Sequence, residues 1–321
     1  MAATLESFLA QGAQMFLVLA IAPAVTGITR RVKARLTRRR GAPLLQGYRD
    51  LLKLVRKDVV LAENASWFFR TAPYLIFAFT WVAAALVPTM ASGLMFNWAA
   101  DVVALVALIG AARALLALAA MDAGTAFGGI GSSREMMIAS LAEPATLLVA
   151  LTIAFAAGTT RLPEVAQFLI NQPIELRVSF ALAFVALVIV ALAENARIPV
   201  DNPITHLELT MVHEAMALEY SGRHLAMIEA AGYLKLVLYI SLIICLFLPF
   251  GMAPIDGGPV AWAIGAVIYL AKVSIAAVAL GVWEVSIAKM RVFRVSEFLG
   301  GAFIFSFLAI LLAFLSREVL R

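Results

Sequence analysis

The sequence predicts an all-α integral membrane protein with about eight transmembrane helices and one amphipathic helix on the cytoplasmic side. Two features of composition lead to this fold class. Hydrophobic residues make up 63% of the 321 residues and charged residues only 14%, whereas soluble domains carry about 25% charged residues. A third observation is that the apolar residues gather in runs of roughly the 20 residues that a helix needs to cross a bilayer.

These apolar runs account for most of the chain. They leave no room for a separate soluble domain, so we interpret residues 1–321 as a single membrane domain. The first run lacks the basic region of a signal peptide, because no Lys or Arg precedes Arg30. We place the spans at residues 5–29, 72–94, 99–121, 136–158, 178–196, 224–249, 259–284 and 298–316.

A basic segment, residues 30–58, separates the first two spans and holds eleven Lys and Arg residues. Within it, residues 46–57 predict an amphipathic helix in the membrane interface, because apolar and basic residues alternate at helical spacing. Composition favours a flank that binds anionic lipid, and the alternative is a docking surface for a soluble partner. The apolar face consists of Tyr48, Leu51, Leu52 and Val55, and the basic face of Arg49, Lys53 and Arg56.

The distribution of basic residues predicts which side of the membrane each loop faces. With the N-terminus outside, the inner segments hold eighteen Lys and Arg residues and the outer side holds four. This bias satisfies the positive-inside rule, so the net charge of +5 reflects topology and not nucleic-acid binding. We expect both termini outside and the loops 30–71, 122–135, 195–223 and 285–297 in the cytoplasm.

The second of these loops, residues 122–135, is rich in Gly and Ser. It lacks the G-x-x-x-x-G-K-S/T pattern of a phosphate-binding loop, and no predicted strand precedes it. We therefore expect a tight turn that packs beneath a partner.

The third inner loop, residues 195–223, is acidic and dense in ionisable side chains. Such a segment at the edge of a bilayer is costly unless it lines water or meets a partner, so it is the first candidate for function. Thr205 and Glu208 fit a capping box, which predicts a helix from His206 to about Tyr220 that ends at Gly222. The ionisable residues are Glu194, Asp201, Glu208, Glu214 and Glu219, with Arg197, His206 and His213.

Metal binding and hydrolysis are both disfavoured. His206, His213, Glu208 and Glu214 do not have the HExxH spacing of a zinc site, and no Ser lies in a G-x-S-x-G turn. Cys245 is the single cysteine and cannot by itself hold an iron–sulfur cluster, which needs about four ligands. We expect no metal ligand and no catalytic residue in this chain.

Five charged side chains fall well inside the predicted spans. Each would cost about 2.5–3.5 kcal/mol at the bilayer centre, so these side chains must meet one another or water. Asp101 and Glu284, near span ends, are interpreted as snorkelling or ion-paired residues. For the central carboxylates and amines, a hydrated path that relays protons is the better interpretation. The five are Arg113, Glu143, Glu229, Lys235 and Lys272.

Two segments resemble the membrane protein of respiratory complex I that links the soluble redox arm to the antiporter-like membrane arm. The basic segment fits through Arg39-Arg40-Gly41, Leu45-Gln46, Tyr48-Arg49-Asp50 and Lys53-Leu54. The resemblance extends over nearly the whole chain. The signature loop reads Ala193-Glu194-x-x-Arg197-x-Pro199-x-Asp201-x-Pro203, followed by Glu219-Tyr220-Ser221-Gly222.

Within that superfamily the chain is more similar to the membrane anchor of group 4 membrane-bound NiFe hydrogenases, including formate hydrogenlyase and hydrogenase-4 complexes. Complex I has more acids after the position of Asp201 and an Arg-rich quinone-site segment after the seventh span. This chain has Ile204-Thr205-His206 and Trp283-Glu284-Val285 there, which argues against quinone binding. The similarity to hydrogenases lies in Asp122-x-Gly124, Gly131-x-Ser133-Arg134-Glu135 and Glu143-Pro144.

The resemblance implies a non-catalytic subunit of an oxidoreductase complex that holds no redox cofactor of its own. The implied partners are a cytoplasmic iron–sulfur subunit, a large hydrogenase-like subunit and antiporter-like membrane subunits. Iron–sulfur clusters, and a nickel–iron centre where one is kept, would lie in those partners. The implied location is the cytoplasmic (inner) membrane of a bacterium or archaeon.

We therefore expect the chain to dock the redox arm and to couple its electron transfer to proton or ion translocation. The alternatives are a true complex I quinone-site subunit, a passive membrane anchor and a stand-alone secondary transporter. The density of charge on the inner side predicts that Arg35, Arg39, Arg40 and Arg197 contact the iron–sulfur partner. The expected ion path consists of Glu143, Glu194, Asp201, Glu208, Glu214, Glu219, Glu229, Lys235 and Lys272.

Overall fold

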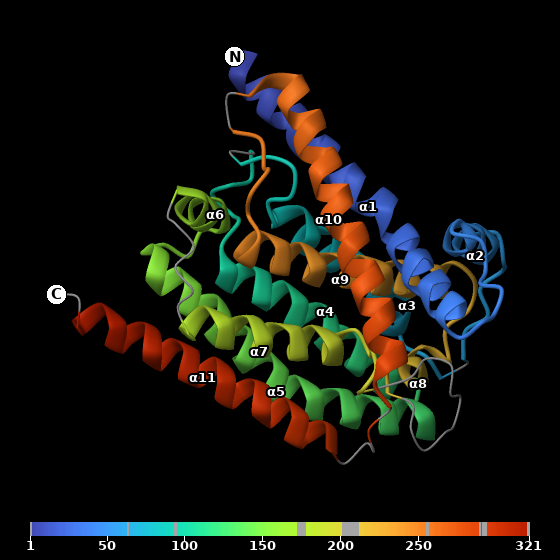
Figure 1. Cartoon of the computed structure of the whole chain (residues 1–321). Helices are drawn as coiled ribbons and strands as arrows, with labels where there is room; N and C mark the ends of the chain where they lie inside the picture. The colour runs from blue at the N-terminus through green and yellow to red at the C-terminus, as the bar shows by residue number, and fades with distance from the viewer. Residues whose placement is uncertain are drawn as a thin grey trace.

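The computed structural model describes residues 2–62, 64–92, 95–171, 178–200, 212–254, 257–288, 290 and 294–319. Within these ranges the only β-type pairs are two isolated bridges, and the predicted all-α fold is confirmed. The helices (Figure 1) are α1 (Ala2–Leu36), α2 (Gln46–Val55), α3 (Trp67–Leu86), α4 (Val102–Asp122), α5 (Ala126–Ala157), α6 (Leu162–Asn171), α7 (Val178–Glu194), α8 (His213–Ala217), α9 (Gly222–Phe247), α10 (Gly258–Ser286) and α11 (Val295–Val319).

Among the described residues, seven helices are long and apolar enough to cross a membrane, and α7 is a shorter apolar helix of 17 residues. Together these eight helices overlap the eight predicted spans one for one. The chain is therefore a multi-pass membrane protein, as its composition predicts.

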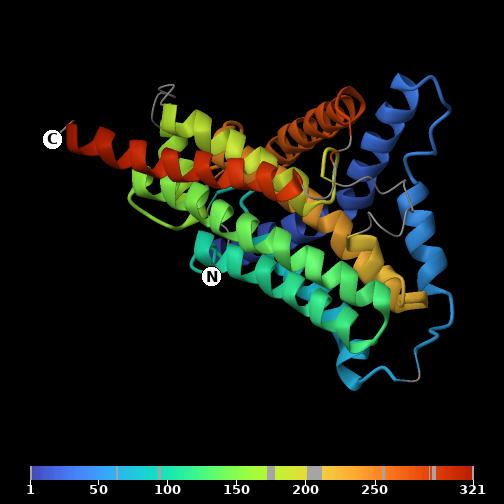
Figure 2. The ribbon, with the colours of Figure 1, turned by 90° about the horizontal axis from the view of Figure 1, so that it is seen from below.

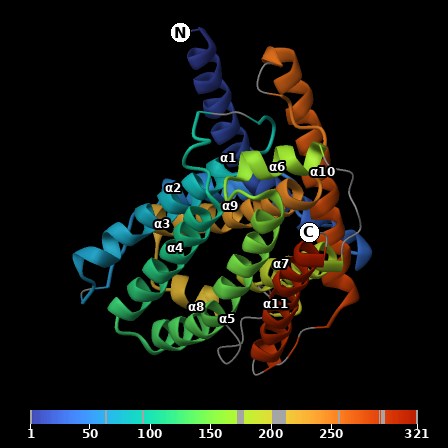
Figure 3. The same ribbon diagram turned by 90° about the vertical axis from the view of Figure 1, so that its left-hand side faces the viewer.

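The helix α9 lies at the centre of the bundle. It contacts α1, α2, α3, α7 and α10, and 72% of its most apolar stretch is buried. On one side α11 packs against α5 and α7, and on another α10 runs along α1. The α1–α10 pair projects beyond the other helices (Figure 3). Buried alanines such as Ala142 in α5 and Ala186 in α7 let neighbouring backbones approach closely.

The predicted amphipathic helix is present as α2, and it packs back against α1. Pro23 has no N–H, so it leaves a carbonyl of the preceding turn of α1 without its helical partner. The Tyr48 hydroxyl donates a hydrogen bond to the nearby Ala20 carbonyl. Gly47 permits close approach, since an added Cβ there would lie 3.0 Å from the Pro23 Cβ. The first helix itself runs past its predicted end at residue 29 and continues to Leu36.

The predicted loop at residues 122–135 is wrong, because α5 already begins at Ala126. Thr125 is its N-cap and accepts a hydrogen bond from the Gly128 N–H. The glycines serve helix packing: a Cβ at Gly128 would lie 2.2 Å from a backbone oxygen of α4, and one at Gly131 would lie 3.0 Å from a side chain of α8. Small residues that suggested a turn therefore bring three helices together.

The predicted end of a helix at Gly222 is also wrong, because Gly222 is the first residue of α9. Its φ is +54°, and a Cβ there would lie 2.6 Å from the Asp58 carbonyl oxygen. Next to it, the Ser221 hydroxyl accepts a hydrogen bond from the Val60 N–H and donates one to the Val60 carbonyl. The glycine thus allows the segment after α2 to contact the start of α9.

The helix predicted from His206 to Tyr220 is described only in part. Its second half contains α8, which spans five residues from His213 to Ala217. Residues 201–211, which include Asp201, His206 and Glu208, lie outside the described residues.

The N-terminal end of α4 and the residues after α5 are joined by hydrogen bonds around Asp101. This carboxylate caps α4 by accepting from the Val103 N–H at 2.7 Å, and it accepts a hydrogen bond from the Thr160 hydroxyl. The sequence predicts a snorkelling or ion-paired residue at Asp101, and the structure instead makes it a helix cap. The short helix α6, which follows, has no counterpart among the predicted elements.

Candidate functional site

Ionisable side chains from four helices meet inside the bundle around Arg113 of α4. Its guanidinium lies 3.3 Å from a Glu135 oxygen and 3.4 Å from a Glu143 oxygen, both on α5, and it pairs with Glu194 at the end of α7. Lys235 of α9 lies 2.9 Å from the other Glu194 oxygen. We call these five residues the ionic cluster.

The ionic cluster is largely removed from solvent. Arg113, Glu135 and Glu194 are buried, while the Glu143 side chain is 40% exposed. Buried charges are tolerated only when each one keeps a well-placed partner. The cluster contains three carboxylates and two cations. If one carboxylate takes up a proton, two charged carboxylates remain to balance the two cations.

A small cavity of about 40 Å³ touches the ionic cluster. Arg113, Glu135 and Lys235 line it together with His213 of α8, and Thr80 and apolar residues form the rest of its wall. This volume is enough for one or two water molecules.

A larger cavity of about 540 Å³ opens among α1, the residues after α7, α8, α9 and the end of α10. We call it the inner cavity. Its lining shares His213, Ile228 and Gly232 with the small cavity, so the two are adjacent. Its charged lining residues are Arg30, Lys33, Arg39, Arg197, Glu214, Glu229 and Glu284.

Glu284 holds two basic residues at the wall of the inner cavity. One oxygen lies 2.8 Å from the Lys33 amine of α1, and the other lies 3.3 Å from the Arg197 guanidinium. Burial lowers the pKa of Arg197 from its usual value, and the Glu284 charge opposes that shift. The interpretation of Glu284 as an ion-paired residue is confirmed.

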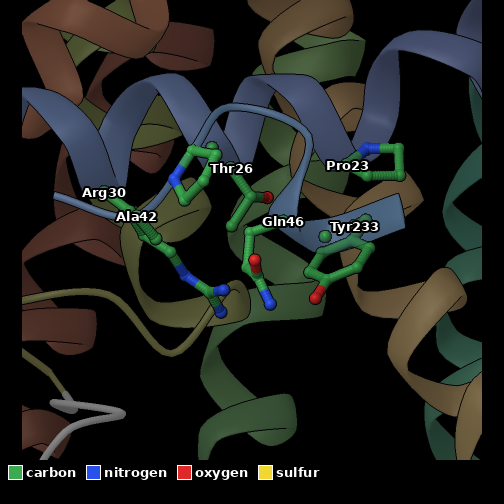
Figure 4. A pocket seen from close by; sticks show the side chains of 9 residues that line it. Pro23, Thr26, Arg30, Ala42, Gln46 and Tyr233 are labelled. Carbon is green, nitrogen blue, oxygen red and sulfur yellow. The ribbon is translucent and has the colours of Figure 1, made fainter. Parts of the chain in front are cut away.

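A third cavity, of about 20 Å³, lies between α1 and α2 (Figure 4). Thr26, Arg30 and Tyr233 line both this cavity and the inner cavity. Gln46 also lines it and donates a hydrogen bond of 2.8 Å to Asp50. Polar groups therefore extend from α2 through Tyr233 to the inner cavity.

The structure brings together most of the described residues of the expected ion path. Glu143, Glu194 and Lys235 belong to the ionic cluster, and Glu214 and Glu229 line the inner cavity.

Two other residues of that path lie elsewhere. Glu219 is half-buried after α8 and lines none of the three cavities. The Lys272 amine donates to the Leu248 carbonyl at 2.6 Å and lies 3.8 Å from the centre of the Phe250 ring. Leu248 and Phe250 follow the C-terminal end of α9, whereas Lys235 lies in the middle of that helix, so the structure separates Lys272 from the ionic cluster. Asp201 and Glu208 lie outside the described residues.

The four arginines expected to dock a partner divide into two groups. Arg35, Arg39 and Arg40 are exposed at and after the C-terminal end of α1. The Arg197 side chain is only 12% exposed and is paired with Glu284. Its guanidinium is therefore held within the chain and does not project from the surface.

Glu135 is the ionic-cluster residue that sequence reasoning missed, because it lay in a predicted loop. Two signals could have found it. Thr125 is a helix-capping residue type ahead of the Gly/Ser run, and Glu135 and Glu143, eight residues apart, lie on one face of a helix. Among the described residues, no three His, Cys, Asp or Glu side chains lie close enough to hold a metal ion.

A model of the NADH dehydrogenase family matches residues 10–315. Formate hydrogenlyase subunit 4 of Escherichia coli is 30% identical over 297 residues, which cover 92% of this chain and 95% of that protein. Hydrogenase-4 component C of Escherichia coli is 33% identical over 244 residues, 75% of each chain.

More distant similarities extend to other redox complexes. An NADH-quinone oxidoreductase subunit of Rhodospirillum centenum is 26% identical over 234 residues, 72% of this chain and 67% of that protein. A chain of the membrane-bound sulfane sulfur reductase, an archaeal respiratory membrane complex, superposes with a TM-score of 0.81 at 19% identity. That match covers 96% of this chain and 99% of the other, and at this identity it shows a shared fold.

Proposed function

The chain belongs to the NADH dehydrogenase family, and from that premise we propose that it docks a cytoplasmic redox arm and couples its electron transfer to proton or ion translocation. Its similarity to formate hydrogenlyase subunit 4 and hydrogenase-4 component C bears out the resemblance found in the signature loop. It is a complex I-like membrane subunit, and the hydrogenase or formate hydrogenlyase type is the branch that we favour.

One observation carries the coupling role: the ionic cluster is connected to the inner side through adjacent cavities. Glu214 and Glu229 line the inner cavity, His213 lines both cavities, and Glu135 and Lys235 line the small one. A passive anchor has no need for five buried or half-buried charges, since ionisable residues inside a membrane are expensive and are usually functional.

The coupling role is tested with the purified complex in sealed vesicles. Electron transfer by the redox arm should generate an ion gradient that an ionophore collapses. A complex that turns over at its full rate without building a gradient would reduce this chain to a passive anchor.

The partners that fit this role are an iron–sulfur subunit, a large hydrogenase-like subunit and antiporter-like membrane subunits. The redox cofactors would belong to the first two. The exposure of Glu143 indicates that another membrane subunit covers it. Its carboxylate is 40% exposed within a predicted span and would otherwise face lipid at a high cost in free energy.

Docking of the redox arm is proposed to use the exposed arginines at the inner end of α1. We expect the pair of changes Arg35→Glu and Arg40→Glu to release the soluble arm from the detergent-purified complex, because charge reversal replaces attraction to partner carboxylates by repulsion. Size-exclusion chromatography with subunit staining measures the release. Arg161→Glu, an exposed arginine after α5, is the matched control, and equal retention in both variants would contradict the docking site.

The topology is proposed to place both termini outside the cell. Figure 2 shows the two ends of the chain toward the same side of the molecule, in keeping with an even number of crossings. We expect cysteines at Arg39 and Thr160 to react with an impermeant reagent from opposite sides of the membrane. The native Cys245 is buried and should not interfere. Labelling of both positions from one side would rule out this topology.

A quinone-site subunit is the second candidate, and the volume of the inner cavity, about 540 Å³, favours it. The departures from complex I after Asp201 and after α10 weigh against it. We expect the purified complex to contain no stoichiometric quinone. Extraction and chromatography would measure it, and one quinone per complex would restore the quinone-site function.

A further inference from the structure

His213 is placed between the inner cavity and the ionic cluster. Of the three described residues that line both cavities, the other two are Ile228 and Gly232, which carry no ionisable group. His213 is close enough to Glu135 for their charges to interact. Among the residues that the structure describes, it is therefore the one shared wall residue that can bind and release a proton.

Close packing fixes this position. His213 is the first residue of α8, and Ala215 and Met216 of the same helix are buried. Both contact α5 at Gly131, where an added Cβ would lie 3.0 Å from either side chain. A histidine on a surface loop would have no such support. Here the backbone of α8 holds the imidazole at the wall that separates the two cavities.

We propose that His213 carries protons between the inner cavity and the carboxylates of the ionic cluster. One ring nitrogen accepts a proton from water in the inner cavity, and the other releases a proton toward Glu135. Rotation of the ring or return of a proton by water restores the first tautomer. No electron, metal or further reactant is required. The proposal rests on the coupling function and specifies that its ion is the proton.

The charges that surround His213 suit this transfer. Glu135 of α5, Lys235 of α9 and Arg113 of α4 share the small cavity with it, and Glu214 and Glu229 share the inner cavity. Histidine is the side chain whose unperturbed charge change falls between pH 5 and 8.

The test measures proton movement in sealed vesicles that contain the whole complex, with electron transfer to a soluble acceptor as a check on the redox arm. His213→Gln should lower the rate of proton translocation by at least about tenfold, in the range of general acid–base effects. His224→Gln is the matched control, because it makes the same change at a buried histidine that lines none of the three cavities. Normal proton translocation in an assembled His213→Gln complex would overturn the proposal.

A second variant separates proton transfer from a structural role. His213→Ala opens space beside the inner cavity, so added imidazole should restore translocation, whereas pyrazole, a ring of the same size but a far weaker base, should not. Absence of rescue by imidazole, or equal rescue by both, would overturn the proposal. A wild-type complex that moves Na⁺ alone would overturn it and leave the coupling function standing. A wild-type complex that moves no ion would refute the coupling function itself.

Discussion

Arg113→Met is expected to lower the apparent melting temperature of the detergent-purified protein by roughly 5–10 °C, since breaking a buried ion pair costs about 3–5 kcal/mol. Methionine fills a similar volume and removes the charge. Glu135 would lose the cation that pairs with it, Glu194 would keep only Lys235, and Glu143 would lose its partner as well. The measurement is thermal unfolding followed by tryptophan fluorescence or by loss of the monodisperse peak.

Arg161→Met provides the comparison for that result. Arg161 pairs with Glu164 at 3.0 Å, but the two side chains are 56% and 47% exposed, and such pairs contribute about 0–1 kcal/mol. Adding Glu135→Gln to Arg113→Met should recover part of the loss, because it removes a buried carboxylate that has lost its ion pair with Arg113. Equal shifts in the two arginine variants, or no recovery in the double variant, would contradict the electrostatic account.

Local sequence patterns were sufficient to predict the helices that cross the membrane. Apolar runs predicted all eight because a bilayer requires each span to satisfy its own backbone and to present apolar side chains. The amphipathic pattern at residues 46–57 predicted α2, because apolar residues at helical spacing mark the face of a helix that packs against an apolar surface. These constraints act within one segment, so one segment is enough to detect them.

Patterns failed where a residue's role depends on another helix. The sequence predicts a turn at Gly128 and Gly131, whereas their missing side chains make room for α4 and α8. It predicts a helix end at Gly222, whereas the positive φ of this residue permits the contact with Asp58. A glycine shows only that space or an unusual backbone is needed. It does not show which neighbour requires it.

The candidate site was predicted in its parts but not in its arrangement. The cost of a charge in a membrane showed that Arg113, Glu143 and Lys235 needed partners. It could not show that Glu194 pairs with both cations, or that Lys272 lies apart from them near Phe250. Pairing depends on which helices are neighbours, and that information lies in the packing of the whole bundle.

Glu143→Gln is expected to lower ion translocation in vesicles by at least about tenfold, in the range of proton-transfer effects, while assembly and partner redox chemistry stay nearly intact. The Glu143 side chain packs against Gly110, where an added Cβ would lie 3.2 Å from a Glu143 oxygen. Glutamine has the same size and should fit there equally well. It also leaves Arg113 paired with Glu135 and Glu194, so the ionic cluster should survive the change.

Glu229→Gln is expected to have the same effect from the other end of the route. Glu229 lines the inner cavity with Arg30 and Tyr233, where a carboxylate can exchange protons with water before they reach His213. Glu164→Gln is the control, because it changes an exposed carboxylate of α6 that lines none of the three cavities. Because the two sites lie at opposite ends of one proposed path, either variant alone should reduce translocation. Normal translocation in both, in complexes that contain every subunit, would mean that the buried charges stabilise the bundle and that the chain is an anchor.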